Sequence, residues 1–277
     1  MPELPEVETV KRVLNQLVIG KKISNVEIKC DKMFKNIESD EFINTVSGQK
    51  ITNIRRLGKY LFFDLETNTF VSHLRMEGKY NFFNQDFELT KHDHVIFYFD
   101  DDSCLMYNDT RKFGTFELVD YQKEQDLTSV NKLGLEPFDE SLTVEYLKDK
   151  AKNKRLSIKQ FLLDQTIITG LGNIYVDEVL FLAKIHPISS VSNLKTKDWQ
   201  TIIEFSVKIL SKSIEEGGTT VKSFSVSGDA SGKFQHQLLV YGHKGEPCVF
   251  CQTPIEKCKI GGRGTHYCKV CQEIKWL

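Results

Sequence analysis

Apolar residues near the start of the chain recur at the spacing that brings them to one face of an α-helix. They are Val7, Val10, Val13, Leu14 and Leu17. Their separations of three, three, one and three positions follow the helical repeat. Pro5 suits the first turn, because the N–H that proline lacks would have no intrahelical partner there. The pattern predicts an amphipathic helix over residues 5–17.

Short runs of β-branched and aromatic residues follow, from about residue 23 to residue 119, with Asp, Asn and Gly between them. Such runs are typical of strands. The predicted strands span residues 51–54, 60–65, 70–74, 79–83, 95–99 and 115–119. Because the pattern places no helix among them, it predicts an antiparallel β-sandwich.

The helical repeat returns after a polar segment at residues 120–139. The predicted helices span residues 144–151, 158–163, 174–183 and 199–214. A stretch rich in Gly, Ser and Thr then predicts a loop at residues 217–233. We therefore expect an N-terminal domain at 1–120, a linker at 121–140, a helical domain at 141–237 and a last segment at 238–277.

The composition is that of a globular protein. The 277 residues are 40% hydrophobic, which is enough for a sizeable core and, at about 150 residues each, for about two domains. No run approaches the roughly 18 apolar residues of a membrane span. The first residues lack the basic and apolar segments of a secretory signal. We therefore expect a cytoplasmic protein without a membrane partner.

The overall charge is close to zero, with 37 Lys and Arg against 38 Asp and Glu, but its distribution is uneven. Residues 1–151 carry 20 basic and 27 acidic side chains, whereas residues 152–277 carry 17 basic and 11 acidic ones. The C-terminal half is therefore the better candidate for an anionic partner such as nucleic acid. A solvated basic face is the commoner reason for an excess of this size.

Five of the seven cysteines lie in the last 30 residues. Four of them form two Cys-x-x-Cys pairs, Cys248 with Cys251 and Cys268 with Cys271, separated by 16 residues. This spacing is typical of a four-cysteine zinc ribbon, in which a hairpin connects the two pairs. Four protein ligands leave no open coordination position, so we expect one structural Zn²⁺. The expected hairpin carries Arg263 between glycines, where it would contact either phosphate or solvent.

Pro2 and Glu3 are candidate catalytic residues at the start of the chain. Removal of Met1 would expose a secondary amine at Pro2. The pKa of an α-amino group is about 7.7–8.0, so a useful fraction of the amine is neutral and nucleophilic at about pH 7. Such an amine can form an iminium with a sugar carbon, and Glu3 is placed to move protons. The two residues alone favour a simpler interpretation, in which Pro2 aids processing and Glu3 is a helix-terminal charge.

Five sequence motifs resemble the signatures of the bacterial formamidopyrimidine-DNA glycosylases. They are PELPEVETV at residues 2–10, RLGKYL at 56–61, HLRMEG at 73–78, DTRKFG at 109–114 and GLGNIYVDE at 170–178. The four-cysteine pattern, with GRGT at 262–265, completes the set. The motifs occur in the family's order along the whole chain, so together they are highly specific.

The resemblance implies a multidomain α+β fold with an N-terminal helix on an antiparallel β-sandwich, a helix-two-turn-helix domain and a C-terminal four-cysteine zinc ribbon. It also implies a bifunctional DNA glycosylase and AP lyase of base excision repair. Such an enzyme acts on double-stranded DNA containing oxidised bases or abasic sites, and chiefly removes oxidised purines such as 8-oxoguanine and formamidopyrimidines. The N-terminal proline forms a Schiff base with the sugar, and β- and δ-elimination cut the strand. We expect a bacterial, nucleoid-associated monomer.

The resemblance also assigns roles to single residues. Pro2 is the implied nucleophile, Glu3 the general acid and base, and Glu6 the support of the N-terminal network. The residues implied to approach the lesion or to grip phosphates near it are Lys59, His92, Lys154, Asn173 and Arg263. Those implied to fill the space left by the extruded nucleotide are Met76, Arg111 and Phe113. Residues 217–233 would fold over the extruded base.

Without the family, several of these residues have simpler interpretations. Lys59 would be an exposed strand lysine and His92 a residue of a surface turn. Met76 and Phe113 would belong to the core. The sequence also departs from the resemblance at His243, where we expect arginine, and this affects a minor phosphate contact.

Two other functions stay open. An endonuclease VIII-like glycosylase for oxidised pyrimidines would share the fold and the mechanism, although Leu4 favours the purine branch because the pyrimidine branch usually shows glycine there. A zinc-ribbon DNA-binding protein without catalysis would need no reactive amine at Pro2.

Overall fold

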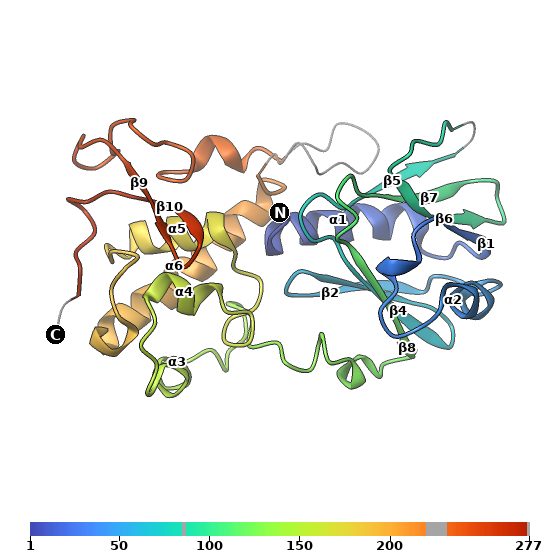
Figure 1. Cartoon of the computed structure of the whole chain (residues 1–277), viewed down its shortest axis with the longest axis horizontal. Helices are drawn as coiled ribbons and strands as arrows, with labels where there is room; N and C mark the ends of the chain where they lie inside the picture. The colour runs from blue at the N-terminus through green and yellow to red at the C-terminus, as the bar shows by residue number, and fades with distance from the viewer. Residues whose placement is uncertain (85–86, 220–231, 276–277) are drawn as a thin grey trace. The chain divides into compact units, whose positions relative to one another are not determined.

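The computed structural model describes residues 1–84, 87–219 and 232–275, which form two compact units (Figure 1). The first unit comprises Met1–Lys132 together with Gly217–Lys233, of which residues 217–219 and 232–233 are described. The second comprises Leu133–Glu216 and Phe234–Leu277. The domain boundaries expected from the sequence stay predictions.

The first unit begins with the predicted amphipathic helix, α1 (Leu4–Val18). Val7, Val10 and Leu14 are fully buried in the core of this unit, and Val13 and Leu17 pack against it. The predicted apolar face is therefore the face that the helix buries, and the boundaries differ from 5–17 by one residue at each end.

Two four-stranded antiparallel sheets form the β-sandwich that the strand pattern predicts. One contains, in order, β1 (Ile23–Ile28), β6 (Asp93–Phe99), β7 (Cys104–Asn108) and β5 (Lys79–Phe83). The other contains β2 (Asn53–Leu57), β3 (Tyr60–Asp64), β4 (Asn68–His73) and β8 (Thr115–Asp120). Phe70 of the second sheet stacks on Phe97 of the first at 5.2 Å between ring centroids. Stacked and edge-on aromatic pairs of this kind join the two inner faces.

The expectation that no helix lies among the strands is wrong, because α2 (Ser39–Val46) separates β1 from β2. Its inward residues Phe42 and Val46 are one turn apart and fully buried. Its three apolar positions, Phe42, Ile43 and Val46, span little more than one turn, which is too short to reveal a helical repeat. A short 3₁₀ turn, Asp31–Met33, precedes this helix.

Strands β1 and β7 had no predicted ranges of their own. All five residues of β7 are buried, so the strand lacks the alternation that marks a half-exposed one. β2 begins two residues later than predicted and continues to Leu57, because pairing with β3 extends to the turn. Residues 120–139 contain another 3₁₀ turn, Glu124–Asp126.

The second unit is helical, as predicted. Its α-helices are α3 (Val144–Ala151), α4 (Ile158–Leu163), α5 (Asn173–Leu182) and α6 (Thr196–Glu215). Short 3₁₀ turns occur at Val191–Asn193 and Phe234–Gln237. None of the helices in the described ranges combines the length and the apolar character that a membrane span needs.

A two-stranded hairpin lies in the last part of the second unit, between the two cysteine pairs, as predicted. It consists of β9 (Glu256–Ile260) and β10 (Arg263–Tyr267). Gly261 and Gly262 connect the strands with φ angles of 55° and 79°. A two-residue turn with two positive φ angles matches the twist of a hairpin, and glycine adopts it without steric cost.

Candidate functional site

The start of α1 brings two buried carboxylates beside Pro2. Glu3 is 2% exposed and Glu6 is fully buried. The backbone N–H of Glu3 donates a hydrogen bond to Glu6 Oε2 at 2.9 Å. Both carboxylates lie at the helix N-terminus, where the unpaired N–H groups favour negative charge. The predicted nucleophile and the predicted acid and base therefore share one ordered, water-poor environment.

Glu6 also binds the chain that follows α6. Its Oε1 accepts hydrogen bonds from the backbone N–H of Thr219 at 2.8 Å and from the Thr219 hydroxyl at 3.0 Å. Gly218 approaches so closely that a Cβ there would lie 2.9 Å from Glu6 Oε1. The predicted loop at 217–233 begins at this contact, and its residues 220–231 lie outside the described residues.

Lys59 lies in the tight turn between β2 and β3. Leu57 pairs with Tyr60, so the turn consists of Gly58 and Lys59, and Gly58 has a φ angle of 57°. Lys59 is only 5% exposed. The interpretation as an exposed strand lysine is therefore wrong: the turn and its surroundings enclose the side chain.

His73 is a buried neighbour of Lys59 that the sequence analysis did not identify. Its burial, followed by the positive charges of Arg75 and Lys59, lowers the pKa of His73 to about 3. His73 Nδ1 accepts the backbone N–H of Arg75 at 3.0 Å, which requires an unprotonated nitrogen. The ring is therefore neutral at physiological pH and adds no charge near Lys59.

Asp109 organises the loop that carries Arg111 and Phe113. Its Oδ1 accepts the Arg111 N–H, and its Oδ2 accepts the N–H groups of Phe113 and Gly114, all at 2.9 Å. The Asp109 N–H in turn donates to the carbonyl of His92 at 3.0 Å. Through its carboxylate and its backbone N–H together, buried Asp109 therefore connects three of the predicted DNA contacts, His92, Arg111 and Phe113. Asp side chains commonly accept hydrogen bonds from the N–H groups of the residues that follow them in a turn. The Asp that begins DTRKFG is therefore a local sequence feature that indicates this turn.

The exposed tip of this loop is an aromatic ring supported by a cation. Phe113 is 51% exposed, so its interpretation as a core residue is wrong. The guanidinium of Arg111 lies 4.6 Å from the centre of the Phe113 ring, a distance typical of a cation–π contact. An exposed ring held in this way is suited to stacking on a base.

Half-buried Met76 lies in the neighbouring turn after β4. The Thr110 hydroxyl donates a hydrogen bond to the Glu77 carboxylate, which joins this turn to the Arg111 loop. Gly78 and Gly114 both pack on the hydroxyl of Tyr107, where a Cβ would lie 2.1 Å and 1.7 Å from the oxygen. Met76, Arg111 and Phe113 are therefore brought to one region of the first unit.

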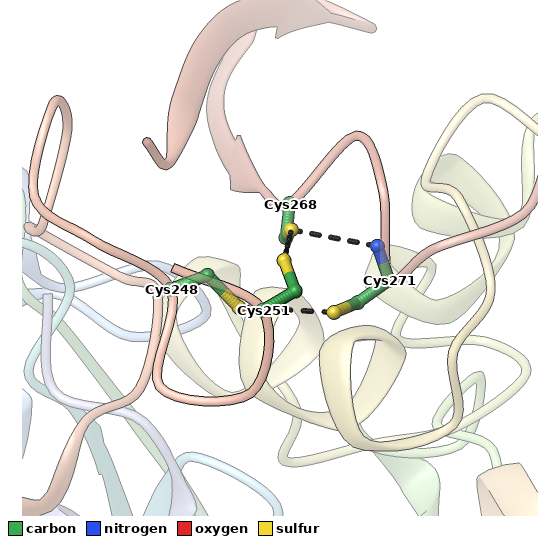
Figure 2. Close-up of side chains that lie close together, drawn as sticks. All are labelled: Cys248, Cys251, Cys268 and Cys271. Atoms are coloured by element: carbon green, nitrogen blue, oxygen red, sulfur yellow. Dashed lines mark hydrogen bonds between the residues drawn. The ribbon is translucent and has the colours of Figure 1, made fainter. Parts of the chain in front are cut away.

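In the second unit, four cysteines form a compact sulfur cluster (Figure 2). The Sγ atoms of Cys248, Cys251, Cys268 and Cys271 all lie within 4.8 Å of one another. Four thiolates in such a group are the donor set of a structural zinc site. Cys258 lies outside this set, on β9 opposite Thr265. The predicted ligands are therefore the residues that hold one structural Zn²⁺.

The hairpin that carries Arg263 is fastened to helices α4 and α5. Asn173 Nδ2 and Lys159 Nζ both donate to the carbonyl of Gly264, at 2.9 Å and 3.1 Å. Lys159 is fully buried and forms an ion pair with Asp177 at 2.6 Å. These contacts bring the predicted residues Asn173 and Arg263 next to one another, because Arg263 precedes Gly264.

Comparisons with known proteins identify the family. The N-terminal domain of formamidopyrimidine-DNA glycosylase matches residues 1–116, its H2TH domain matches 133–225, and the zinc finger found in FPG and IleRS matches 245–274. The formamidopyrimidine-DNA glycosylase of Exiguobacterium sibiricum is 47% identical over 275 residues, which cover 99% of both chains. That of Listeria innocua is 44% identical over 273 residues, covering 99% of this chain and 100% of the relative. The chain belongs to the formamidopyrimidine-DNA glycosylase family.

Solved structures of family members agree. Lactococcus lactis Fpg, bound to DNA containing N7-benzyl-Fapy-dG, matches with a TM-score of 0.91 and 41% identity over 98% of this chain and 100% of that one. Its complex with DNA containing an abasic site matches with a TM-score of 0.90 and 40% identity over the same shares. The family fold, with its β-sandwich, helix-two-turn-helix domain and zinc finger, is the fold that the sequence predicted.

Lys159 and Asp177 are buried polar residues of the family fold that the sequence analysis missed. Lys159 is the second residue of α4, and nothing in the local sequence distinguishes it from an ordinary helix lysine. Lys154, which the sequence analysis selected, is half-buried in the segment between α3 and α4, where its N–H donates to the carbonyl of Ala151. It is Lys159 that reaches Gly264, and a phosphate contact by Lys154 stays a prediction.

Proposed function

We propose that this chain is a bifunctional DNA glycosylase and AP lyase that removes oxidised purines, such as 8-oxoguanine and formamidopyrimidines, during base excision repair. The observation that carries the proposal is the start of α1, where Pro2 precedes the buried carboxylates of Glu3 and Glu6. Structures of the Lactococcus lactis relative bound to Fapy-dG and abasic-site DNA support the same substrate class.

The proposed reaction begins after Met1 is removed. The lone pair of the Pro2 nitrogen attacks C1′ of the damaged nucleotide, and the bond between C1′ and the base breaks with its electrons leaving on the base. Glu3 transfers the protons, including the one that the leaving base takes up. Opening of the sugar ring leaves an iminium between C1′ and Pro2. Loss of a C2′ proton then expels the 3′ phosphate, and δ-elimination expels the 5′ phosphate.

The other residues are proposed to bind the DNA around this reaction. Lys59 approaches the lesion or its flanking phosphate, and Met76, Arg111 and Phe113 occupy the gap in the duplex. The proposed phosphate contacts are His92, Lys154, Asn173 and Arg263. We infer that the enzyme acts as a monomer on double-stranded DNA in the bacterial cytoplasm, where it is associated with the nucleoid.

Borohydride trapping tests the proposal most directly. An imine between Pro2 and the sugar would be reduced to a stable covalent protein–DNA adduct, whereas a zinc-ribbon protein that only binds DNA would give none. We expect adducts with duplexes containing 8-oxoguanine opposite cytosine and with abasic duplexes. The absence of an adduct with either duplex would overturn the proposal.

Oxidised pyrimidines are the second candidate substrate class, because a Lactococcus lactis relative has been solved with DNA containing an oxidised pyrimidine. Excision rates on 8-oxoguanine and thymine-glycol duplexes separate the two classes. We expect 8-oxoguanine to be excised faster. The reverse order would assign the enzyme to the endonuclease VIII-like branch.

A further inference from the structure

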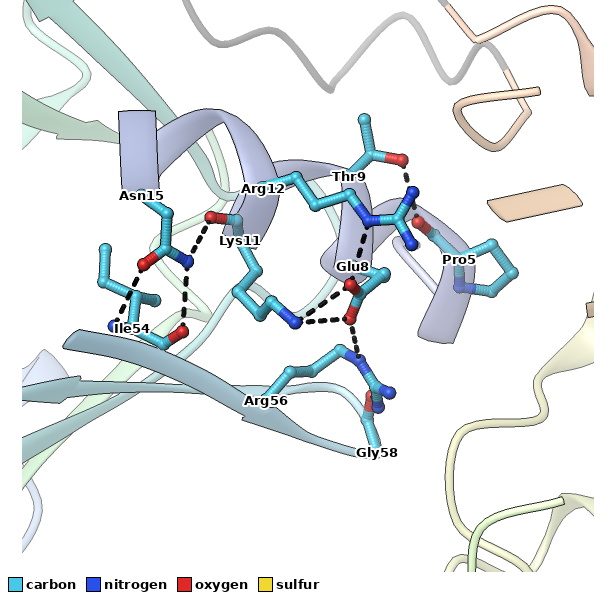
Figure 3. A network of polar contacts seen from close by, with 9 residues as sticks. All are labelled: Pro5, Glu8, Thr9, Lys11, Arg12, Asn15, Ile54, Arg56 and Gly58. Atoms are coloured by element: carbon cyan, nitrogen blue, oxygen red, sulfur yellow. Dashed lines mark hydrogen bonds and ion pairs between the residues drawn. The ribbon is translucent and has the colours of Figure 1, made fainter. Parts of the chain in front are cut away.

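Glu8 lies in the third position after Pro5 and gathers three cations on one buried carboxylate (Figure 3). Lys11 and Arg12 contact its Oε1 at 2.9 Å and 3.0 Å, and Arg56 donates to its Oε2 at 3.0 Å. The side chains of Glu8 and Arg56 are both 9% exposed, whereas that of Arg12 is 56% exposed. Arg56 is therefore the partner that shares the buried environment of Glu8.

Arg56 binds two different elements with one guanidinium. Its Nε donates to Glu8 on α1, and its Nη1 donates to the carbonyl of Gly58 at 3.1 Å. That carbonyl belongs to the peptide group that joins Gly58 to Lys59. The side chain therefore connects the first turns of α1 with the peptide immediately before Lys59 (Figure 3).

A second contact already fastens α1 to the same strand. Asn15 Nδ2 donates to the carbonyl of Ile54 at 3.1 Å, and Asn15 Oδ1 accepts the N–H of Ile54 at 3.3 Å. Asn15 therefore holds the helix on β2 at a point before Arg56 in the strand. Asn15 binds only the strand, whereas Arg56 also binds Gly58 in the turn that carries Lys59.

We propose that Arg56, held by Glu8, is a positioning residue that fixes the Gly58–Lys59 peptide relative to the helix start and so orients Lys59 for the reaction at Pro2. This inference rests on the proposed function. Lys59 itself would touch the DNA, whereas Arg56 would act only through it. Small errors in the position of a catalytic group have large effects on rate, so a rigid turn is an advantage.

The chemistry of the two side chains fits this role. A guanidinium is planar and always charged, and its forked N–H groups can hold two acceptors at fixed directions, whereas a lysine ammonium cannot reproduce that fork. Burial raises the pKa of Glu8, but the hydrogen bonds from Lys11 and Arg56 outweigh it and hold the pKa below its ordinary value. Glu8 therefore stays ionised at neutral pH and keeps Arg56 in place.

A double-mutant cycle with Lys59 tests the proposal. The variants are Arg56→Lys, Lys59→Ala and the combination of both, each in the full-length enzyme with Met1 removed. Single-turnover excision of 8-oxoguanine is measured at saturating enzyme, and binding is measured with a duplex containing tetrahydrofuran as an uncleavable abasic analogue. Asn15→Ala is the matched control for fastening α1 to β2, and Arg12→Ala is the control for a lost cation at Glu8.

We expect Arg56→Lys to lower the excision rate by about tenfold or more while affinity for the tetrahydrofuran duplex is nearly unchanged. In the Lys59→Ala background the same substitution should change the rate by no more than about twofold. Both control variants should stay within about twofold of the parent rate.

Two outcomes would overturn the proposal. One is an equal effect of Arg56→Lys with and without Lys59, which would show that Arg56 does not act through it. The other is a loss of excision rate in Asn15→Ala as large as that in Arg56→Lys, with equal melting temperatures. Arg56 would then only hold α1 on β2 and would have no separate role in positioning Lys59. Failure of the parent enzyme to excise the base would instead contradict the proposed function, so the two failures are distinguishable.

Discussion

Glu6 Oε1 accepts a hydrogen bond from the backbone N–H of Thr219 at 2.8 Å, although 213 positions separate the two residues in the sequence. The other oxygen of Glu6 accepts the N–H of Glu3. One carboxylate therefore binds both the helix start that carries Pro2 and the described beginning of the predicted lesion loop. A substitution at either end of this contact should therefore disturb the structure at the other end.

Gly218→Ala is expected to disturb this contact. Gly218 has a φ angle of 82°, and a Cβ there would lie 2.9 Å from Glu6 Oε1. Gly20→Ala is a matched control, because Gly20 has the same φ angle of 82° and nothing within 4 Å of the added carbon. The control should lose about 1 kcal/mol from backbone strain alone. Gly218→Ala should lose more stability and also slow excision, as measured by thermal unfolding and single-turnover assays; equal losses of stability in both variants would contradict this.

Retention of Met1, or a tag on Pro2, is expected to abolish strand cleavage while binding to lesion-containing DNA persists. Only the processed chain presents a secondary amine at Pro2, and an amide nitrogen is not nucleophilic. Mass spectrometry would establish the terminus, and gel assays would measure cleavage. Full lyase activity from a homogeneous protein that retains Met1 would remove Pro2 from the mechanism.

Glu3→Gln is expected to lower glycosylase activity by about 10²–10⁴-fold, the usual contribution of proton transfer. The amide keeps the shape of the 2% exposed side chain, so affinity for a tetrahydrofuran duplex should change little. Exposed Glu140 provides a control, since Glu140→Gln removes the same charge from the surface of the other unit. A loss below about tenfold would return Glu3 to a purely structural role.

Cys258→Ser is expected to keep one zinc per chain and near-normal cleavage, because its thiol lies outside the four-sulfur cluster. Cys251→Ser should lose zinc, loosen the hairpin that presents Arg263 and weaken DNA binding, since a structural metal contributes folding free energy directly. Metal analysis and DNA titration measure both effects. Zinc lost from the first variant but kept by the second would refute the ligand set.

Folding stability should fall on acidification partly because of His73. Burial, with the charges of Arg75 and Lys59, lowers the pKa of His73 to about 3, from an ordinary value of 6.5. Between these values the unfolded chain binds a proton that the folded one does not, so the free energy of unfolding falls as pH decreases through this window. His73→Asn removes this linkage and should flatten the pH dependence between about pH 6.5 and about pH 3. An unchanged slope in denaturant titrations would contradict the assignment.

The sequence by itself determined the features that depend on local order. Helices α1 and α3 to α6 were predicted within a few residues, because their apolar positions repeat over one or more turns. The zinc ligands were determined by the spacing of two short pairs, which leaves Cys258 out. The motifs were sufficient to identify the family, because each is a contiguous run of residues that can be read directly from the sequence.

Only the tertiary structure decided features that depend on partners far away in the chain. No local sequence pattern predicts three of these features. They are the burial of Lys59 in its turn, the hydrogen bonds of Asp109 to the loop of Arg111 and Phe113, and the contact of Lys159 with Gly264. The helix α2 escaped prediction for a related reason, since its three apolar residues span little more than one turn and only packing in the core of the first unit distinguishes them.

The same distinction separates Glu6 from Glu8. The sequence places both at the start of one helix, where the helix dipole favours either carboxylate. The fold turns Glu6 toward Thr219 and Glu8 toward Arg56. Local chemistry therefore determined that these positions are acidic, and long-range packing decided which part of the chain each carboxylate holds, because a carboxylate buried away from water must find its hydrogen-bond donors wherever the fold supplies them.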